Sequence, residues 1–220
     1  MVICGNPGVG KTEFAKFLSL FIPDNTKVIT IEDTREWYYS KLKPEADGIE
    51  LLSSEKKDYT QLIKTSVRLN PGRIMLAETR SAEAAELLEA WSTGMKGITT
   101  LHTDDLRNVP DRFLNMMNCV GSKSHENNIY DYLDTAVLIK AAKNADGTYT
   151  RYIDQIAYYE RNKDDKKITF IVEDGQRTDE EIPDYIRKKF SDELISNPYV
   201  LDNDLKEKVK FYEGKKEKKE

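Results

Sequence analysis

Residues 5–12 read Gly-Asn-Pro-Gly-Val-Gly-Lys-Thr, a spacing that suits the binding of a nucleotide triphosphate. Glycines allow backbone N–H groups to turn inward on phosphate oxygens because no Cβ stands in the way. Lys11 can supply a cation to the β- and γ-phosphates, and Thr12 can supply a hydroxyl to Mg²⁺. The nucleotide-binding residues predicted from this loop are Gly5, Asn6, Pro7, Gly8, Val9, Gly10, Lys11, Thr12 and Glu13.

The loop lies between an apolar segment, Val2–Cys4, and an amphipathic helix. Helical spacing is seen in four apolar residues after the loop: Phe14, Phe17, Leu18 and Phe21. Such a helix directs the positive end of its dipole toward the anion. A glycine-rich turn without nucleotide is the alternative, and this strand–loop–helix context disfavours it.

Acidic residues gather where the second apolar segment, Val28–Ile31, ends. Glu32, Asp33 and Glu36 would leave the carboxyl edge of a strand, where ligands bind in open α/β sheets. One carboxylate could accept the proton of an attacking water, and another could orient the water shell of the metal. A charged strand exit without a chemical role is the alternative, and the position one strand–helix unit after the phosphate loop disfavours it.

A third apolar segment, Arg73–Ala77, ends in Glu78. An acid at this place can hold Mg²⁺ through water, so Thr12 and Glu78 form the predicted metal site. Arg80 could pair with Glu78, contact phosphate or face a neighbouring subunit.

His102 follows a further apolar segment, Ile98–Leu101, again at the edge where the other motifs lie. A lone histidine is more often structural, but the three neighbouring motifs favour a place in the site. His125 lies in a polar stretch, residues 122–128, and is expected at the surface.

Short apolar segments alternate with amphipathic ones over the first 140 residues, which predicts a parallel sheet flanked by helices. A fifth strand is predicted at Ala136–Lys140, and Asp58 is a predicted cap of a helix that ends near Leu69. A further helix is indicated by the spacing of Ala84, Leu87, Leu88 and Trp91.

The character of the sequence changes after Ile139. Tyr149–Tyr159 and Lys167–Val172 are rich in β-formers, which predicts antiparallel strands at the edge of the sheet. From Thr178 to about Tyr212 the pattern is helical and highly charged.

A formal charge of -5 disfavours a protein that coats nucleic acid by its net charge. Two cysteines give neither a disulfide framework nor a four-ligand zinc site. No segment approaches the roughly 18 apolar residues that cross a membrane, and no signal peptide is present. We therefore expect a cytoplasmic protein without direct membrane insertion, peripheral to the membrane through its partners.

The four motifs, in this order and spacing, resemble those of the secretion ATPase superfamily, the ring-forming traffic ATPases of type II and type IV secretion, type IV pili and conjugation. The Walker A, Asp box, Walker B and His box of that family correspond to Gly5–Thr12, Ile31–Glu36, Ile74–Glu78 and Gly97–His102. The resemblance covers about residues 1–175. The branch of type IV secretion and tight-adherence pilus ATPases fits better, because the type II branch usually carries a four-cysteine zinc module, for which this chain has too few cysteines.

The resemblance implies an α/β fold, a RecA-like P-loop NTPase with a mostly parallel sheet flanked by helices, antiparallel edge strands and a helical C-terminus. It implies a RecA-like domain at residues 1–175. The charge pattern after that domain predicts a charged helical extension at 176–214 and a solvated tail at 215–220. The N-terminal domain of the family, which commonly supplies arginines to the nucleotide site and much of the ring contact, is expected to be absent from this sequence.

The resemblance also implies residue roles, with ATP and Mg²⁺ as cofactors. Glu36 is the favoured general base, supported by Glu32 and Asp33. Glu78 is the Walker B acid, and His102 couples the γ-phosphate site to subunit movement. Lys11, Thr12 and Arg80 complete the predicted site.

The implied function is ATP hydrolysis by a homo-oligomer, a hexameric ring, which powers secretion, conjugative transfer or pilus assembly with inner-membrane machinery as partner. Two alternatives stay open: a nucleotide-gated assembly module with little turnover, and a RecA-like motor that translocates nucleic acid. The acidic balance and the lack of a basic–aromatic stripe disfavour direct contact with nucleic acid.

Overall fold

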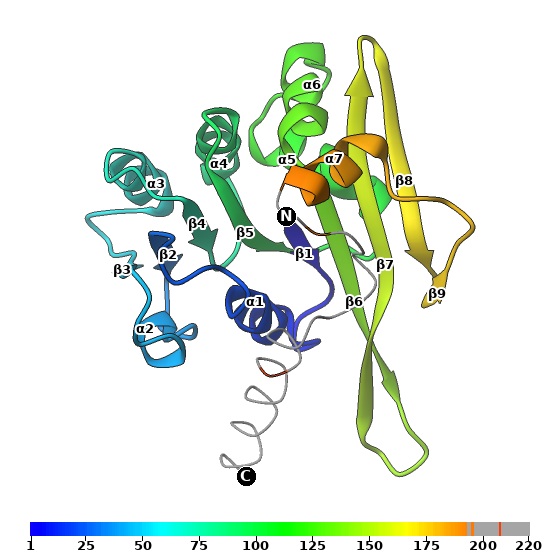
Figure 1. Ribbon diagram of the computed structural model, residues 1–220, viewed down its shortest axis with the longest axis horizontal. Coiled ribbons are helices and arrows are strands. Elements are labelled where there is room, and N and C mark those ends of the chain that lie inside the picture. Colours follow the sequence, from blue (N-terminus) through cyan, green and yellow to red (C-terminus); the bar gives the residue numbers. More distant parts are fainter. Residues whose placement is uncertain (193–194, 196–206, 208–220) are drawn as a thin grey trace.

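The computed structural model describes residues 1–192 together with residues 195 and 207. The strands of this part are β1 (Val2–Cys4), β2 (Val28–Glu32), β3 (Gly48–Leu52), β4 (Arg73–Leu76), β5 (Lys96–Leu101), β6 (Thr135–Lys143), β7 (Tyr149–Asn162), β8 (Asp165–Glu173) and β9 (Gln176–Arg177). Within the described residues they form one nine-stranded sheet in the order β3-β2-β4-β5-β1-β6-β7-β8-β9 (Figure 1).

The sheet is parallel from β3 to β6 and antiparallel from β6 to β9. The strand before the glycine-rich loop, β1, lies inside the parallel part, where Ile3 is paired with Thr100 on one side and with Val137 on the other. This arrangement confirms the predicted mostly parallel sheet with antiparallel edge strands.

The helices are α1 (Lys11–Ser19), α2 (Tyr39–Leu42), α3 (Tyr59–Val67), α4 (Glu83–Ser92), α5 (Val109–Met116), α6 (Lys123–Tyr132) and α7 (Asp184–Asp192), with a 3₁₀ turn, η1, at Leu106–Asn108. The predicted cap of α3 is confirmed, because the Asp58 carboxylate accepts a hydrogen bond from the backbone N–H of Gln61 at 2.9 Å. No helix among the described residues is both long enough and apolar enough to cross a membrane.

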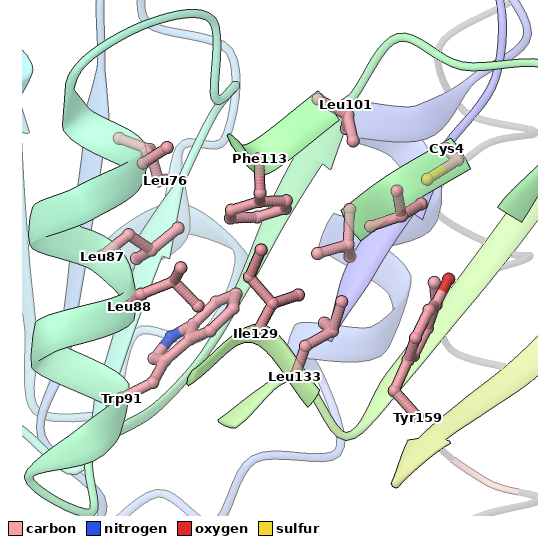
Figure 2. Packing of buried hydrophobic residues seen from close by; sticks show 14 of the residues in the cluster. Cys4, Leu76, Leu87, Leu88, Trp91, Leu101, Phe113, Ile129, Leu133 and Tyr159 are labelled. Carbon is pink, nitrogen blue, oxygen red and sulfur yellow. The ribbon is translucent and has the colours of Figure 1, made fainter. Parts of the chain in front are cut away.

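Two hydrophobic cores lie on opposite faces of the sheet, because alternate residues of a strand point to opposite faces. Ile29 and Ile31 join the core under α3, α4, α5 and α6, whereas Val28 joins the core under α1 and α2. Figure 2 shows the first core, in which Leu87 and Trp91 of α4 point toward Phe113 and Ile129. This core includes all four residues whose spacing predicted α4: Ala84, Leu87, Leu88 and Trp91.

The four apolar residues predicted to form the buried face of the helix after the glycine-rich loop are not its most buried residues in the structure. α1 is present, but the residues that it buries are Lys11, Ala15 and Ser19, whereas the four predicted apolar residues are only partly buried. Small side chains at 15 and 19 allow α1 to lie close to the sheet, and its larger apolar side chains lie at the margin of the contact.

Six elements were not predicted: β3, β9, α2, α5, α6 and the turn η1. β3 is an edge strand whose side chains are mostly half-buried, so its sequence carries no clear apolar alternation. α5 and α6 also lacked a recognised sequence signal, although His125 on α6 is exposed as expected.

In the charged C-terminal segment, α7 confirms helix at Asp184–Asp192. The prediction is wrong for residues 178–183 and 195, which are not helical; Pro183 disfavours helical backbone at the residue before it. The rest of the prediction falls outside the described residues apart from 207. The helix packs on the antiparallel strands, since Ile186 contacts Tyr158 in a small third core and Tyr185 donates a hydrogen bond to the carbonyl of Tyr159 at 2.7 Å. The proposed division at residue 175 stays a prediction.

Candidate active site

Three glycines of the loop between β1 and α1, Gly5, Gly8 and Gly10, have positive φ. Gly5 has φ of 142°, and a Cβ at this position would lie 2.5 Å from the backbone oxygen of Ile139 on β6. Gly10, with φ of 95°, turns the chain into the first turn of α1. The N–H groups of that turn and of the loop are therefore available to an anion at the N-terminus of the helix.

Lys11 lies inside this loop and is only 8% exposed. Its Nζ donates hydrogen bonds to the carbonyl oxygens of Gly5 at 2.9 Å and Asn6 at 3.2 Å, and lies 3.3 Å from Nδ1 of His102. Burial lowers the pKa of Lys11, while the nearby carboxylate of Glu78 opposes this shift. The loop thus holds a positive charge where the β- and γ-phosphates are expected.

A chain of polar contacts joins the ends of three parallel strands. Nε2 of His102, after β5, lies 2.9 Å from Oε1 of Glu78, after β4. The guanidinium of Arg80 contacts Oε2 of Glu78 at 2.7 Å and Oδ2 of Asp33, after β2, at 3.1 Å. Hydrogen bonding to Glu78 is the main cause of a raised pKa for Arg80. Of the partners considered for Arg80, the described residues show Glu78, and Asp33 is a further partner that was not predicted.

Glu32 has a different position from the other acids. Its side chain is buried, with 1% exposure, and Oε1 accepts hydrogen bonds from the backbone N–H groups of Glu36 at 3.0 Å and Trp37 at 2.9 Å. Burial raises the pKa of Glu32, and the two backbone hydrogen bonds oppose that shift. Glu32 therefore holds the loop that carries Asp33 and Glu36 but does not reach the cavity wall.

A cavity of about 1010 Å³ opens beside the glycine-rich loop. The predicted residues on its wall are Pro7, Gly8, Val9, Gly10, Lys11, Thr12, Glu13, Asp33, Glu36, Glu78, Arg80 and His102. Gly5 and Asn6 meet the site through their carbonyl contacts with Lys11. Apart from Glu32, the four sequence motifs therefore converge on one concave site of a size suited to a small-molecule ligand.

Several wall residues were not predicted from the sequence: Phe14, Phe17, Ala77, Thr100, Ile139, Arg151, Tyr152 and Ile153. Thr100 has a positioning contact, since its hydroxyl donates to the carbonyl of Ala77 at 2.7 Å. Arg151 and Tyr152 lie on β7, far along the chain from the loop. No short-range signal marks them, because only the fold of β6 against β7 brings them to the cavity.

The residues present fit Mg²⁺ bound together with a triphosphate. Among the described residues, no group of three or more His, Cys, Asp or Glu side chains could hold a metal ion by itself. Mg²⁺ usually keeps several waters and takes one or two protein oxygens plus phosphate oxygens. The hydroxyl of Thr12 and the carboxylate of Glu78, both on the cavity wall, match that need.

The fold and the cavity define a P-loop NTPase of the RecA-like type, with acidic and histidine side chains following the parallel strands. The chain belongs to the family described as "Type II/IV secretion system protein", which its residues 1–140 match. This membership confirms the resemblance to the secretion ATPase superfamily.

Relatives of known sequence support this assignment. An uncharacterized protein of Bacillus anthracis is 33% identical over an alignment of 170 residues, and the match covers 72% of this chain and 38% of that protein. Conjugal transfer protein TrbB of Rhizobium radiobacter is 37% identical over an alignment of 109 residues, and the match covers 47% of this chain and 32% of that protein.

Solved structures agree on the fold. The VirB11 ATPase of the Brucella suis type IV secretion system, in complex with sulphate, has a TM-score of 0.64 at 27% identity, over 71% of this chain and 47% of that one. The pilus retraction motor PilT with bound ADP has a TM-score of 0.60 at 18% identity, over 74% of this chain and 48% of that one, and bears on the fold alone. This chain spans less than half the length of each of these relatives.

Proposed function

We propose that this chain is the ATP-hydrolysing domain of a ring-forming traffic ATPase that powers macromolecule secretion, conjugative transfer or pilus assembly. The observation that carries the proposal is that Lys11, Thr12, Glu36, Glu78 and His102 all line the same cavity. Membership of the type II/IV secretion family supports the same function.

In this proposal the loop and α1 hold the triphosphate, and Lys11 exchanges its carbonyl partners for oxygens of the β- and γ-phosphates. Thr12 and Glu78 would hold Mg²⁺, Glu78 mostly through water. The ion, when bound, neutralises negative charge on the phosphates that separate during hydrolysis.

Glu36 is the proposed general base. It is exposed to the cavity, and its backbone is fixed by the hydrogen bond to Glu32. Glu36 takes a proton from a water whose oxygen bonds to the γ-phosphorus, while the bond from that phosphorus to the β–γ bridging oxygen breaks and ADP leaves with the electron pair.

His102 is proposed to couple the γ-phosphate to movement. It lies between Lys11 and Glu78, at 3.3 Å and 2.9 Å. A γ-phosphate that draws Nζ of Lys11 away alters the contacts of His102, and His102 begins the segment that follows β5. Occupancy of the phosphate site is thereby transmitted to the residues after β5.

The partners follow from the same proposal: other copies in a hexameric ring, and inner-membrane components of a secretion, conjugation or pilus machine. The protein would then work in the cytoplasm, peripheral to the membrane through those components. The relatives named as type IV secretion and conjugal transfer proteins support this placement.

Phosphate release from Mg-ATP tests the proposal. Lys11→Ala removes the cation from the loop and should lower the rate about a hundredfold or more. Lys56→Ala is the matched control, since Lys56 is an exposed lysine that does not line the cavity, and should release phosphate like the wild type. Equal rates for wild type and Lys11→Ala would overturn the proposal.

A nucleotide-gated assembly module gives a different result in the same experiments. Such a module would bind ATP and lose binding in Lys11→Ala, yet show no turnover in the wild type. Light scattering with and without a non-hydrolysable ATP analogue then reports whether the nucleotide changes the assembly state.

A further inference from the structure

β6 and β7 form a long hairpin that runs past the glycine-rich loop and projects beyond the other strands (Figure 1). Ile139 of β6 is opposite Ile153 of β7, and both contribute to the hydrophobic core under α1. The backbone oxygen of Ile139 also lies only 2.5 Å from the place where Gly5 would carry a Cβ. The hairpin is therefore packed against both the phosphate loop and the helix that follows it.

The alternation of side chains along β7 decides which of them faces the loop. Successive side chains of a strand point to opposite faces of a sheet, so Arg151 lies on the same face as Ile153, the face that α1 covers. Tyr152, between them, points to the other face, where a Cβ added at Gly175 would lie 3.4 Å from its ring. The fold thus turns Arg151 toward the phosphate loop and Tyr152 away from it.

The side chain of Arg151 lies directly along that loop. Its Nη2 is 3.4 Å from the carbonyl oxygen of Gly8. A Cβ on Gly10 would lie 3.5 Å from Cδ and 3.7 Å from Nε of the same side chain. Arg151 therefore spans from Gly8 to Gly10, beside the N–H groups that the loop and α1 make available to an anion.

The charge of Arg151 has no carboxylate partner in the part of the chain that the structure describes, where its hydrogen bond is the long one to Gly8. The other arginine on the cavity wall, Arg80, is held by Glu78 and Asp33. A hydrogen bond of 3.4 Å to a neutral oxygen is weaker than one that a guanidinium makes to an anion. Arg151 can therefore exchange its present contact for a phosphate oxygen at little cost.

We propose that Arg151 is a phosphate-binding residue of the nucleotide site, supplied by the same chain as the loop. This inference rests on the proposed binding of ATP. When a triphosphate enters the loop, the guanidinium exchanges the carbonyl oxygen of Gly8 for a phosphate oxygen and adds a second cation to that of Lys11. A guanidinium suits this exchange because it presents several N–H donors in a fixed fork.

Calorimetric titration of Arg151→Gln with inorganic triphosphate and with a non-hydrolysable ATP analogue, each with Mg²⁺, tests this role. Glutamine keeps an N–H donor for the carbonyl oxygen of Gly8 but removes the charge. We expect the binding of both ligands to weaken about tenfold, because each loses one charge-assisted hydrogen bond to phosphate. A loss of affinity for the analogue alone would contradict a phosphate contact, since the two ligands share only their phosphates.

Salt separates a contact with phosphate from one that only holds the loop in shape. Arg151 is exposed, so dissolved ions screen its attraction to a phosphate. The ratio of the wild-type affinity to that of Arg151→Gln should therefore fall when the salt concentration is raised from about 0.05 M to about 0.5 M. A ratio that stays constant would show that Arg151 acts on the loop alone, and the proposal would be wrong.

The same hairpin offers a matched control. Lys143→Gln removes an exposed cation from β6 at a position that does not line the cavity, and it should bind both ligands like the wild type. Arg151→Lys, which keeps the charge, should lose less affinity than Arg151→Gln. Thermal melting without ligand checks that all variants are folded.

Two failures of these experiments have different meanings. Binding by Arg151→Gln equal to that of Lys143→Gln would overturn the role of Arg151 and leave the proposed function intact, because Lys11→Ala would still abolish binding. If the wild type binds neither ligand, the proposed function itself is wrong.

Discussion

Substitution of Glu32 distinguishes a positioning role from a chemical one. Oε1 of Glu32 accepts two backbone hydrogen bonds, from Glu36 at 3.0 Å and Trp37 at 2.9 Å, in a place where the side chain is 1% exposed. Glu32→Gln keeps an oxygen that can accept both bonds. Glu32→Ala removes the acceptor and leaves both donors without their partner.

The size of the effect follows from these contacts. A buried donor without a partner costs about 1–3 kcal/mol, and the N–H of Glu36 is only partly buried, so that water can replace part of its bond. We expect Glu32→Ala to lower the free energy of unfolding by about 2–4 kcal/mol. Because burial raises the pKa of Glu32, its charged form is disfavoured, and the neutral amide of Glu32→Gln should cost less than about 1 kcal/mol.

Urea denaturation and phosphate release, measured on the same samples, test this reasoning. Glu32→Gln should retain both stability and turnover, whereas Glu32→Ala should lose stability and, as the loop of Glu36 loosens, turnover as well. A Glu32→Gln protein that is as stable as the wild type but hydrolyses no ATP would refute the positioning role, because Glu32 would then act in the chemistry.

Three further predictions concern other parts of the structure. Leu87→Ala empties part of the α4 core and should cost about 2–5 kcal/mol in urea denaturation, whereas Leu52→Ala, 42% exposed, should change stability by less than about 1 kcal/mol. Gly5→Ala places a Cβ 2.5 Å from a backbone oxygen of β6 and should reduce both the melting temperature and the affinity for ATP. Gly121→Ala, also at positive φ but facing open space, should reduce the melting temperature and leave the affinity for ATP unchanged. Burial lowers the pKa of Lys11 below 10.5, so between the lowered pKa and 10.5 the unfolded state binds more protons than the folded state. The unfolding free energy of the wild type relative to Lys11→Met should therefore rise with pH in that window. A difference that falls with pH would contradict the lowered pKa.

The parallel core of the fold could be predicted because its signals are local. β1, β2, β4 and β5 are short apolar segments, each bounded by turn or helix signals, and α4 repeats its apolar residues with helical period. β3 could not, since an edge strand with half-buried side chains needs no strict alternation and gains its pairing from β2.

Some residues of the candidate site could likewise be predicted from local sequence, and others could not. Lys11, Glu78 and His102 each follow a recognisable strand, and parallel strands end at one edge, so their convergence could be inferred without coordinates. The burial of Glu32 and the approach of Arg151 depend on tertiary packing. Nothing in the neighbouring sequence of either residue distinguishes it from an exposed charge.

The most direct test of the proposed catalytic site is phosphate release by Glu36→Gln, measured beside its affinity for a non-hydrolysable ATP analogue. Glu45→Gln is the control, because Glu45 is an exposed acid that does not line the cavity. We expect Glu36→Gln to bind the analogue like the wild type and to lose about a hundredfold or more of the hydrolysis rate, while Glu45→Gln loses neither. Unchanged hydrolysis by Glu36→Gln would contradict the assignment of the base and with it the proposed catalytic site.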